Sequence, residues 1–445
     1  MKSEETFIGY KGTTLKWMKN QSLKVWDEIE IIKEGTSLKG VILPRSELAD
    51  PNFISLKLPT GYNIGFDPIK TKKIKKIGHF EAKYRIPKTE ISQKPNLPLI
   101  PILGCGGTIA SRLDYQTGGT IPALSPEELF SSFPEIADLA RVETHLLFEI
   151  FSENLNFDHY ERILKAIDDI IKTRSPQGIV LTHGTDTMAF TASALTFAIN
   201  NPPIPIVITG SQRSSDRPSS DAFFNLYNSV LYAASPRARK QVVIIMHEES
   251  SDTSCTIHTG TRVRKMHSSR RDTFKTIGES PLGRIINGKI QYSRKDKVIE
   301  SKDSHYHVST KFERMVGLIN HYPGIQSDVI DFYVNAGYKG LVLAGTGLGH
   351  FSSNLIPVIR KAVNNGLIVV MTTQCLQGFT GLSVYENGRQ LQKAGVIPLS
   401  NILPEIAYIK LAYLLGNYRE SEKIKELMKM NLKGEIKSRE RFCEF

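Results

Sequence analysis

Three glycine-rich segments carry the side chains that could do chemistry. They are GCGGTIAS (104–111), THGTDTMAF (182–190) and TGSQRSSDRPSSD (209–221). All three contain hydroxyl groups, and two also contain an aspartate. Each follows an apolar run of strand length. Ligands of open parallel sheets bind beyond the carboxyl ends of the strands. A single loop of this kind can be purely structural, but three in succession favour one shared site for a small polar ligand.

Other readings of these motifs fail. GCGGTIAS lacks the GK[ST] ending of a phosphate-binding loop, and Ile109 stands where a dinucleotide-binding motif needs its third glycine. The chain has no GxSxG, which disfavours a serine α/β-hydrolase. His305 and His307 form an isolated H-x-H in a polar segment, without a third ligand nearby, so we expect no bound metal.

A threonine-centred site remains. A threonine hydroxyl is a poor nucleophile until a base takes its proton. A lysine can be that base if burial or a neighbouring positive charge lowers its pKa. A carboxylate is then needed to orient the lysine. Threonine, lysine and aspartate are therefore a sensible set for acyl transfer from an amide.

The elements that must position these loops alternate between strand and helix. The pattern predicts strands over 97–104, 178–184, 204–211 and 242–249, and helices over 158–174, 186–200 and 219–235. A second series has strands over 340–347 and 367–375, and helices over 352–366 and 405–416. Such alternation predicts α/β domains, with a parallel sheet covered by helices on both faces in the larger one.

The N-terminal part is different. Residues 1–70 read as short strands separated by turn residues, which is typical of a small β-barrel or sandwich. The expected domains are a small β-barrel over 1–75, a linker over 76–96, a larger α/β domain over 97–300 and a smaller one over 311–435. The four cysteines form no CxxC pair, which disfavours a zinc ribbon or a secreted disulfide framework.

The charge is concentrated near the start of the chain. The 445 residues carry a formal net charge of +12, and residues 1–97 hold 18 Lys and Arg against 11 Asp and Glu. The densest run, KTKKIKKIGH (70–79), is a solvated linker or a contact for RNA phosphates. The start of the chain lacks the apolar stretch of a signal peptide, and the strongest apolar runs are too short for a membrane helix. We expect a cytoplasmic protein.

Four segments carry a resemblance to a known family. These are GGTIAS (106–111), LTHGTDTMAFTASAL (181–195), ITGSQRSSDRPSSDAFFNL (208–226) and QGFTGLSVYENGRQLQKAGVIP (377–398). From about residue 98 to 430 the chain resembles the bacterial-type L-asparaginase and glutaminase amidohydrolases. The resemblance implies an asparaginase-like body made of a larger and a smaller α/β domain.

The resemblance also implies roles for particular residues. Thr108 would attack the side-chain amide carbon, and Thr185, Asp186 and Lys265 would form the proton-shuttling group. Ser152 and Glu153 resemble the loop that grips the substrate's α-amino and carboxylate groups, and Tyr115 is the candidate for the family's mobile-loop tyrosine. Thr108 and Asp186 could instead be helix caps. Lys265, among four arginines, would by itself read as part of a basic surface loop.

The basic N-terminal domain points to a narrower group. A basic barrel joined to an asparaginase-like body resembles the D subunits (GatD) of archaeal glutamyl-tRNA(Gln) amidotransferases. This implies hydrolysis of L-glutamine to glutamate and ammonia. A GatE-type partner would bind the tRNA(Gln) and use ATP and Mg²⁺ to convert Glu-tRNA(Gln) to Gln-tRNA(Gln). This chain itself would bind no cofactor. It also implies a homodimer within a heterotetramer, away from membranes.

Two alternatives stay open. One is a stand-alone cytoplasmic L-asparaginase with an accessory domain, because asparagine and glutamine differ by one methylene, worth only ~1–3 kcal/mol in a pocket. The other is a non-catalytic RNA-binding or scaffold protein on an inactive amidohydrolase fold. The presence of all four expected catalytic residue types speaks against the second.

Overall fold

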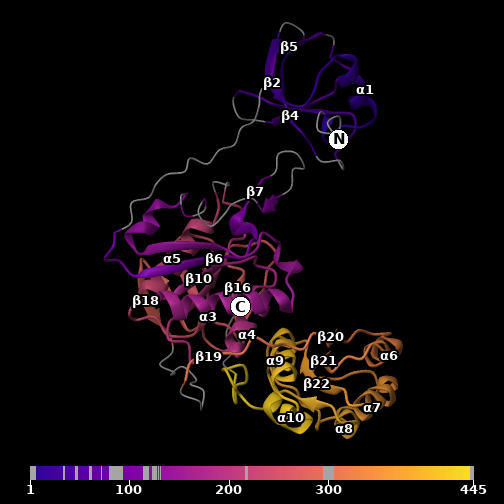
Figure 1. Ribbon diagram of the computed structural model, residues 1–445. Helices are drawn as coiled ribbons and strands as arrows, with labels where there is room; N and C mark the ends of the chain where they lie inside the picture. Colours follow the sequence, from indigo (N-terminus) through magenta and orange to yellow (C-terminus); the bar gives the residue numbers. More distant parts are fainter. Residues whose placement is uncertain are drawn as a thin grey trace. The chain divides into compact units, whose positions relative to one another are not determined.

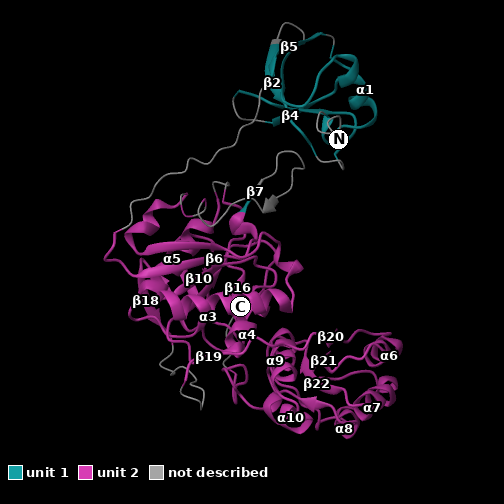
Figure 2. Cartoon of the chain, viewed as in Figure 1, with its two compact units in different colours: residues 1–89, 111–123 teal, residues 90–110, 124–445 magenta. Residues whose placement is uncertain are grey.

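The computed structural model divides the chain into two units (Figures 1 and 2). The first comprises residues 1–89 and 111–123, and the second residues 90–110 and 124–445. The residues described are 7–33, 36–45, 49–59, 63–71, 73–79, 94–113, 120–122, 128, 130, 132–215, 219–293 and 305–440.

The first unit is built around an antiparallel sheet of five strands. Their spatial order is β4-β3-β2-β1-β5. The elements are α1 (Gly12–Asn20), β1 (Asp27–Lys33), β2 (Thr36–Ile42), β3 (Ile54–Lys57), β4 (Asn63–Phe66) and β5 (Lys73–His79). In the described residues the edge strands β4 and β5 do not pair with each other. The sheet is therefore open and does not close into the small barrel expected from the sequence. A hairpin of β7 (Ser111–Leu113) and β8 (Thr120–Pro122) also belongs to this unit and pairs with no other described strand.

Helix α1 corrects the expectation of strands throughout residues 1–70. Thr14 and Met18 are one helical turn apart and are both fully buried, while Met18 joins the core of the sheet. Residues spaced by four lie on the same face of a helix. Tertiary packing of this one face therefore decides the local structure.

The basic run is also more ordered than a linker. Strand β5 pairs with β1 along its length and ends at His79, so residues 76–79 belong to the sheet and not to the expected linker. Lys76 Nζ and His79 Nδ1 both lie 2.7 Å from Oδ1 of the fully buried Asp27. The remainder of the expected linker, residues 80–93, lies outside the described part of the chain.

The larger lobe, from β6 to β19, contains an eight-stranded sheet with the order β18-β17-β14-β13-β12-β10-β6-β9. Strands β13, β12, β10, β6 and β9 are parallel, and the other three continue the sheet in antiparallel fashion. The sheet strands are β6 (Leu99–Gly104), β9 (Arg141–Leu146), β10 (Ile179–Thr182), β12 (Ile206–Thr209), β13 (Val242–His247), β14 (Ser254–Thr259), β17 (Gly283–Ile286) and β18 (Lys289–Tyr292). The helices are α3 (Phe157–Arg174), α4 (Met188–Ala198) and α5 (Ala222–Ala234), and two short pairs are β11 (Ile199–Asn200) with β19 (His307–Val308) and β15 (Val263–Lys265) with β16 (Phe274–Thr276).

The smaller lobe, from β20 to α10, is a four-stranded parallel sheet with helices. Its strand order is β20-β21-β22-β23. The elements are β20 (Val316–Asn320), α6 (Asp328–Asn335), β21 (Gly340–Gly345), α7 (Ile356–Asn364), β22 (Ile368–Thr373), α8 (Glu386–Lys393), β23 (Ile397–Pro398), α9 (Pro404–Asn417) and α10 (Ser421–Lys429). The α/β body with its parallel sheets therefore confirms the fold class expected from the sequence.

The two lobes share one hydrophobic core. Helix α9 of the smaller lobe packs against α4 of the larger one (Figure 1). The rings of Phe197 on α4 and Tyr413 on α9 stack with centroids 6.2 Å apart. Buried side chains of α4 and α9 belong to the same apolar cluster. Both helices are apolar around most of their circumference, as a helix buried between layers must be. No helix in the described residues has the length and apolarity needed to span a membrane.

Candidate active site

The loops identified in the sequence leave neighbouring strands at one edge of the large sheet. Gly104 at the end of β6 pairs with Thr182 of β10 and with Leu146 of β9, and Thr182 pairs with Thr209 of β12. The four carboxyl ends therefore lie side by side. This is the edge at which an open parallel sheet binds its ligand.

Two glycines bring the first two loops into contact. Gly107 has φ +82°, and a Cβ atom built on it would lie 2.3 Å from the backbone nitrogen of Gly184. Only glycine tolerates both this conformation and this approach. Thr108 follows Gly107, and Thr185 follows Gly184, so the contact fixes the two threonine-bearing turns against each other.

Lys265 links two of the predicted residues directly. Its Nζ donates hydrogen bonds to Thr185 Oγ1 at 2.9 Å and to Asp186 Oδ1 at 2.7 Å. Thr185 is buried, the Lys265 side chain is 16% exposed and the Asp186 side chain is 66% exposed. Because the Thr185 oxygen accepts from the lysine, its own hydroxyl hydrogen can point to another acceptor. The three groups form a continuous path for a proton that opens to solvent at Asp186.

Ser152 and Glu153 lie beside the same loop. They occupy a single 3-10 turn over Ser152–Asn154, and Ser152 is 3% exposed whereas Glu153 is exposed. A Cβ atom on Gly184 would lie 2.7 Å from Ser152 Oγ, and Thr187 Oγ1 donates to the Ser152 carbonyl at 2.7 Å. The structure thus brings both residues next to the Thr185 and Asp186 turn.

The segment after Thr108 is partly described. Thr108 begins a short 3-10 turn that ends at Ala110, and its side chain is half-buried. The Ile109 carbonyl accepts a hydrogen bond of 2.5 Å from Ser215 Oγ, which joins this turn to the third glycine-rich loop. Tyr115, expected as the mobile-loop tyrosine, lies outside the described residues.

His183 is a supporting residue that sequence reasoning did not single out. It is fully buried, and burial lowers its pKa to about 4, so the ring is neutral at physiological pH. Nδ1 lies 2.6 Å from the Gly184 carbonyl, which can only accept, so Nδ1 carries the proton. Nε2 then accepts from Thr191 Oγ1 at 2.8 Å. The ring therefore fastens the Gly184 turn to helix α4.

Asp221 holds the third loop in the same way. Its buried carboxylate accepts from the backbone N–H groups of Gln212 and Arg213, each at 3.0 Å, and from Asn225 Nδ2 at 3.0 Å. Asn225 Nδ2 also donates to the Gly210 carbonyl at 2.9 Å. Aspartate followed four residues later by asparagine, at the start of a helix, is the available sequence signal for this contact.

Cys105, the second residue of the first glycine-rich segment, is 1% exposed. Burial raises the pKa of its thiol to about 12, so it stays protonated and does not act as a nucleophile. A buried, protonated thiol of this kind packs like a small apolar side chain.

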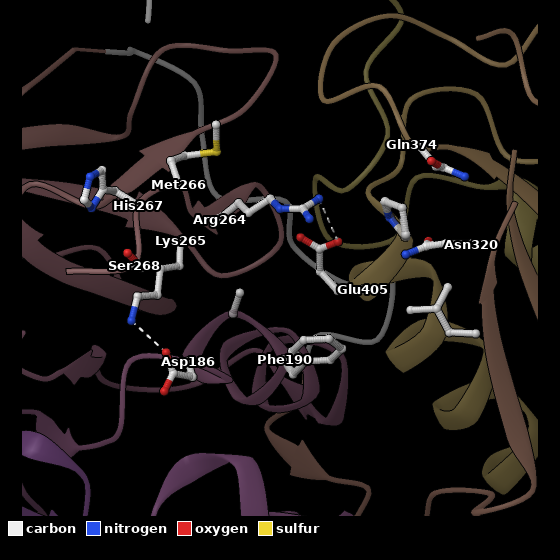
Figure 3. A pocket seen from close by; sticks show the side chains of 13 residues that line it. Asp186, Phe190, Arg264, Lys265, Met266, His267, Ser268, Asn320, Gln374 and Glu405 are labelled. Atoms are coloured by element: carbon white, nitrogen blue, oxygen red, sulfur yellow. Dashed lines mark hydrogen bonds and ion pairs between the residues drawn. The ribbon is translucent and has the colours of Figure 1, made fainter. Parts of the chain in front are cut away.

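A pocket of about 570 Å³ opens beside Lys265 and Asp186 (Figure 3). Lys265 and Asp186 belong to the wall of the pocket that the larger lobe supplies. The smaller lobe supplies the opposite wall, with Asn320, Gln374 and Glu405. Arg264 Nη1 of the larger lobe and Glu405 Oε2 of the smaller lobe are 3.5 Å apart across it. Burial raises the pKa of Glu405, although the charge of Arg264 opposes this. The described residues contain no cluster of three or more His, Cys, Asp or Glu that could hold a metal ion.

Comparisons with known proteins divide the chain in three. Residues 23–77 match the family model described as "GatD N-terminal domain", residues 99–298 match "Asparaginase, N-terminal" and residues 315–428 match "Glutaminase/Asparaginase C-terminal domain". The chain is 44% identical over 440 residues to the D subunit of the glutamyl-tRNA(Gln) amidotransferase of Pyrococcus abyssi, which covers 96% of this chain and 98% of that protein.

The chain belongs to the GatD family, the D subunits of glutamyl-tRNA(Gln) amidotransferases. The corresponding subunit of Methanopyrus kandleri is 40% identical over 435 residues, with 96% of this chain and 94% of that one covered. Membership makes the chain an amidotransferase subunit with an asparaginase-type amidohydrolase body.

Solved structures agree for the body alone. The thermostable L-asparaginase from Thermococcus kodakarensis matches with a TM-score of 0.67 and 30% identity, covering 76% of this chain and 99% of that chain. The L-asparaginase I from Vibrio cholerae matches with a TM-score of 0.66 and 29% identity, covering 77% and 99%. Each asparaginase is therefore matched almost completely, while about a quarter of this chain remains unmatched.

Proposed function

We propose that this chain hydrolyses L-glutamine to glutamate and ammonia as the glutaminase component of a glutamyl-tRNA(Gln) amidotransferase. The observation that carries the proposal is the position of Lys265 Nζ within hydrogen-bond distance of both Thr185 Oγ1 and Asp186 Oδ1. This group lies at the sheet edge where the Thr108 turn packs on the Thr185 turn. A hydroxyl nucleophile beside a group that can accept its proton is the requirement of acyl transfer from an amide.

In the proposed mechanism Thr108 Oγ1 attacks the side-chain amide carbon of glutamine. Its proton passes into the group of Thr185, Lys265 and Asp186, and the amide nitrogen leaves as ammonia after taking up a proton. The resulting ester on Thr108 is then hydrolysed by water, which regenerates the hydroxyl and releases glutamate. Ser152 and Glu153 hold the α-amino and carboxylate groups of the substrate, beside the turn that carries Asp186.

The ammonia is used by a partner subunit of the GatE type. The name of the relatives supports this, because it specifies a subunit of an amidotransferase that acts on glutamyl-tRNA(Gln). In the proposal the partner binds tRNA(Gln) and uses ATP and Mg²⁺, and two copies of this chain pair within a heterotetramer in the cytoplasm. The basic strand β5 of the first unit faces the phosphates of the tRNA-bound complex.

A stand-alone asparaginase is the competing function. The solved asparaginases match the body, but the match to the GatD N-terminal domain over 23–77 favours the amidotransferase subunit. The two solved asparaginases are each matched over 99% of their own length, while about a quarter of this chain stays unmatched. The choice between glutamine and asparagine depends on one methylene of the substrate.

Ammonia release tests the proposal. The purified chain is given glutamine or asparagine, with and without the partner subunit and glutamate-charged tRNA(Gln). We expect glutamine turnover that rises sharply with the partner and the charged tRNA. Vigorous asparagine hydrolysis by the chain alone, unchanged by both additions, would establish the competing function instead.

A further inference from the structure

The last described segment of the chain, residues 431–440, crosses between the two lobes. We call it the C-terminal strap. On the larger lobe its Lys433 carbonyl accepts from Thr261 Oγ1 at 3.1 Å, and Lys433 Nζ donates to Asn200 Oδ1 at 2.8 Å. On the smaller lobe the backbone N–H of Lys437 donates to Asn401 Oδ1 at 3.0 Å. The strap is thus attached to both lobes by hydrogen bonds.

Arg262 is the centre of this arrangement. Its side chain is fully buried, and it precedes the strand that carries Lys265. Nη1 donates to the Asn401 carbonyl at 2.7 Å and to the Glu435 carbonyl at 3.2 Å. Nη2 lies 3.5 Å from Glu440 Oε1. A buried guanidinium must find such partners, because an unpaired charge in the interior is very costly.

The same side chain also grips the hairpin of β15 and β16. Arg262 Nε donates to the Ile277 carbonyl at 2.9 Å, and the Ile277 N–H donates back to the Arg262 carbonyl at 2.8 Å. These bonds close the open end of the hairpin just beyond its Val263 and Thr276 pair. Gly278 leaves the room for this, since a Cβ atom on it would lie 2.1 Å from Arg262 Nη2.

The strap itself is held rigidly from the other side. The fully buried Glu435 carboxylate lies 2.7 Å from the Nζ of the fully buried Lys410 on α9. It also accepts from the backbone N–H groups of Leu432 and Lys433 at 2.9 and 2.7 Å. Glu440 in turn accepts from the Gly378 N–H at 2.6 Å and from Asn401 Nδ2 at 3.0 Å. The carbonyl and carboxylate that receive Arg262 are therefore not free to follow it.

We propose that Arg262, clamped by the C-terminal strap, is a positioning residue that places the Lys265 amine between Thr185 and Asp186. The inference rests on the proposed function for its catalytic readout. Lys265 lies three residues after Arg262, at the other end of strand β15, so a shift at the end closed by Arg262 moves the amine relative to its two partners. Displacements of about 1 Å can lower turnover ~100-fold.

The kinetic test uses Arg262→Lys and Glu440→Gln in the full chain. Tyr306→Phe serves as the control, because it removes one hydrogen bond to a carboxylate, that of Asp168, elsewhere in the second unit. We expect kcat for glutamine to fall about 10- to 100-fold in both strap variants with KM nearly unchanged, and no fall in the control. In a Lys265→Arg background, Glu440→Gln should add little further loss, since both changes act on the same amine.

A second measurement does not depend on activity. Hydrogen–deuterium exchange of peptides spanning 262–277 should accelerate in Glu440→Gln and not in Tyr306→Phe. If Arg262→Lys does not fold, Glu440→Gln decides. Unchanged kcat and unchanged exchange in a folded Glu440→Gln protein would overturn the inference, and so would losses fully additive with Lys265→Arg. A wild-type chain that releases no ammonia even with partner and charged tRNA would instead refute the proposed function, leaving the exchange result to judge the strap.

Discussion

Lys265 Nζ lies 2.7 Å from Asp186 Oδ1, although 79 residues separate the two in the chain. Asp186 comes from the turn after the parallel strand β10, while Lys265 ends the short strand β15, which pairs only with β16 in the described part of the structure. The pair therefore exists only when the sheet and the hairpin have both formed. It is a product of the tertiary fold and of no local sequence pattern.

Asp186→Asn should reduce glutamine turnover by several orders of magnitude, roughly 10⁴-fold by analogy with mis-oriented triads. The amide keeps the shape of the side chain but loses the charge that orients the lysine. Steady-state ammonia release measures the effect. Near-normal turnover by a folded Asp186→Asn protein would refute the role of the pair.

Thr108→Val should abolish formation of the acyl-enzyme. Valine has the shape of threonine without the hydroxyl, so the fold should be nearly unchanged. Mass spectrometry of the protein after mixing with glutamine measures the acyl-enzyme, and we expect no acyl adduct in this variant. Thr108→Ser is the matched control and should keep measurable turnover, because it retains the hydroxyl.

Gly107→Ala should inactivate the protein more severely than its backbone strain predicts. The left-handed conformation by itself costs about 1–2 kcal/mol for a residue with a side chain. At Gly107 the added methyl would also collide with the Gly184 backbone. Gly324→Ala is the control, since Gly324 has φ +86° and, apart from its own chain neighbours, no atom of the described residues lies within 4 Å of the position of a Cβ. Equal losses of activity in the two variants would contradict the contact between the two turns.

Acid should destabilise the protein through His183. Burial lowers the pKa of its ring from 6.5 to about 4 in the folded state. The unfolded chain therefore binds more protons between those values, and the free energy of unfolding decreases as the pH falls from about 6.5 to about 4. Between pH 7 and pH 5 this one group accounts for about 2 kcal/mol. In His183→Asn the difference in unfolding free energy between pH 7 and pH 5, measured in denaturant, should shrink by that amount.

Burial also lowers the pKa of His258, to about 3. The unfolding free energy of His183→Asn should therefore still decrease on acidification, by a smaller amount than that of the wild type. A pH dependence identical to that of the wild type would show that His183 is not buried in its neutral form.

The lysines of β5 should differ in their roles. Lys73 and Lys75 are exposed, and neither has a salt bridge to another described residue, whereas Lys76 pairs with the buried Asp27. Burial raises the pKa of Asp27, but hydrogen bonds from Lys76, the Lys24 N–H and His79 outweigh it, so the net pKa is lowered.

Replacing Lys73 and Lys75 by Gln should therefore weaken association with the tRNA-bound complex. The slope of the logarithm of the binding constant against the logarithm of the salt concentration should become shallower, by the equivalent of up to about two phosphate contacts. Lys76→Gln should instead lower the thermal stability of the first unit. Binding isotherms over a range of salt concentrations measure the first effect, and thermal unfolding measures the second. An unchanged salt slope in the double variant would exclude these lysines from phosphate contact.

Much of the body could be predicted from the sequence. The apolar runs ending at Gly104, Thr182 and Thr209 form neighbouring parallel strands, as their alternation with helices requires. The convergence of the glycine-rich loops then follows from the topology. Lys265 could be assigned by family resemblance only, because its sequence surroundings are those of a basic surface loop.

Long-range burial could not be predicted in this way. Arg262 is one of the arginines that suggest a solvated loop, yet its side chain has no exposure and its partner Glu435 is 173 residues away. The polar segment 275–293 carries no predicted strand, yet it supplies β17 and β18 to the large sheet. In both cases a polar segment is stabilised by hydrogen-bond partners that are distant in the sequence and that only the tertiary fold brings near.

The common core of α4 and α9 has a consequence for how substrate reaches the site. Two lobes joined by a narrow connection can open by a hinge motion. Here, however, buried side chains of these two helices belong to one apolar cluster. Separating them would expose that cluster to water at roughly 25 cal/mol per Å². A hinge motion between the lobes is therefore costly, and we expect substrate to reach Lys265 and Asp186 through the pocket beside them without separation of the lobes.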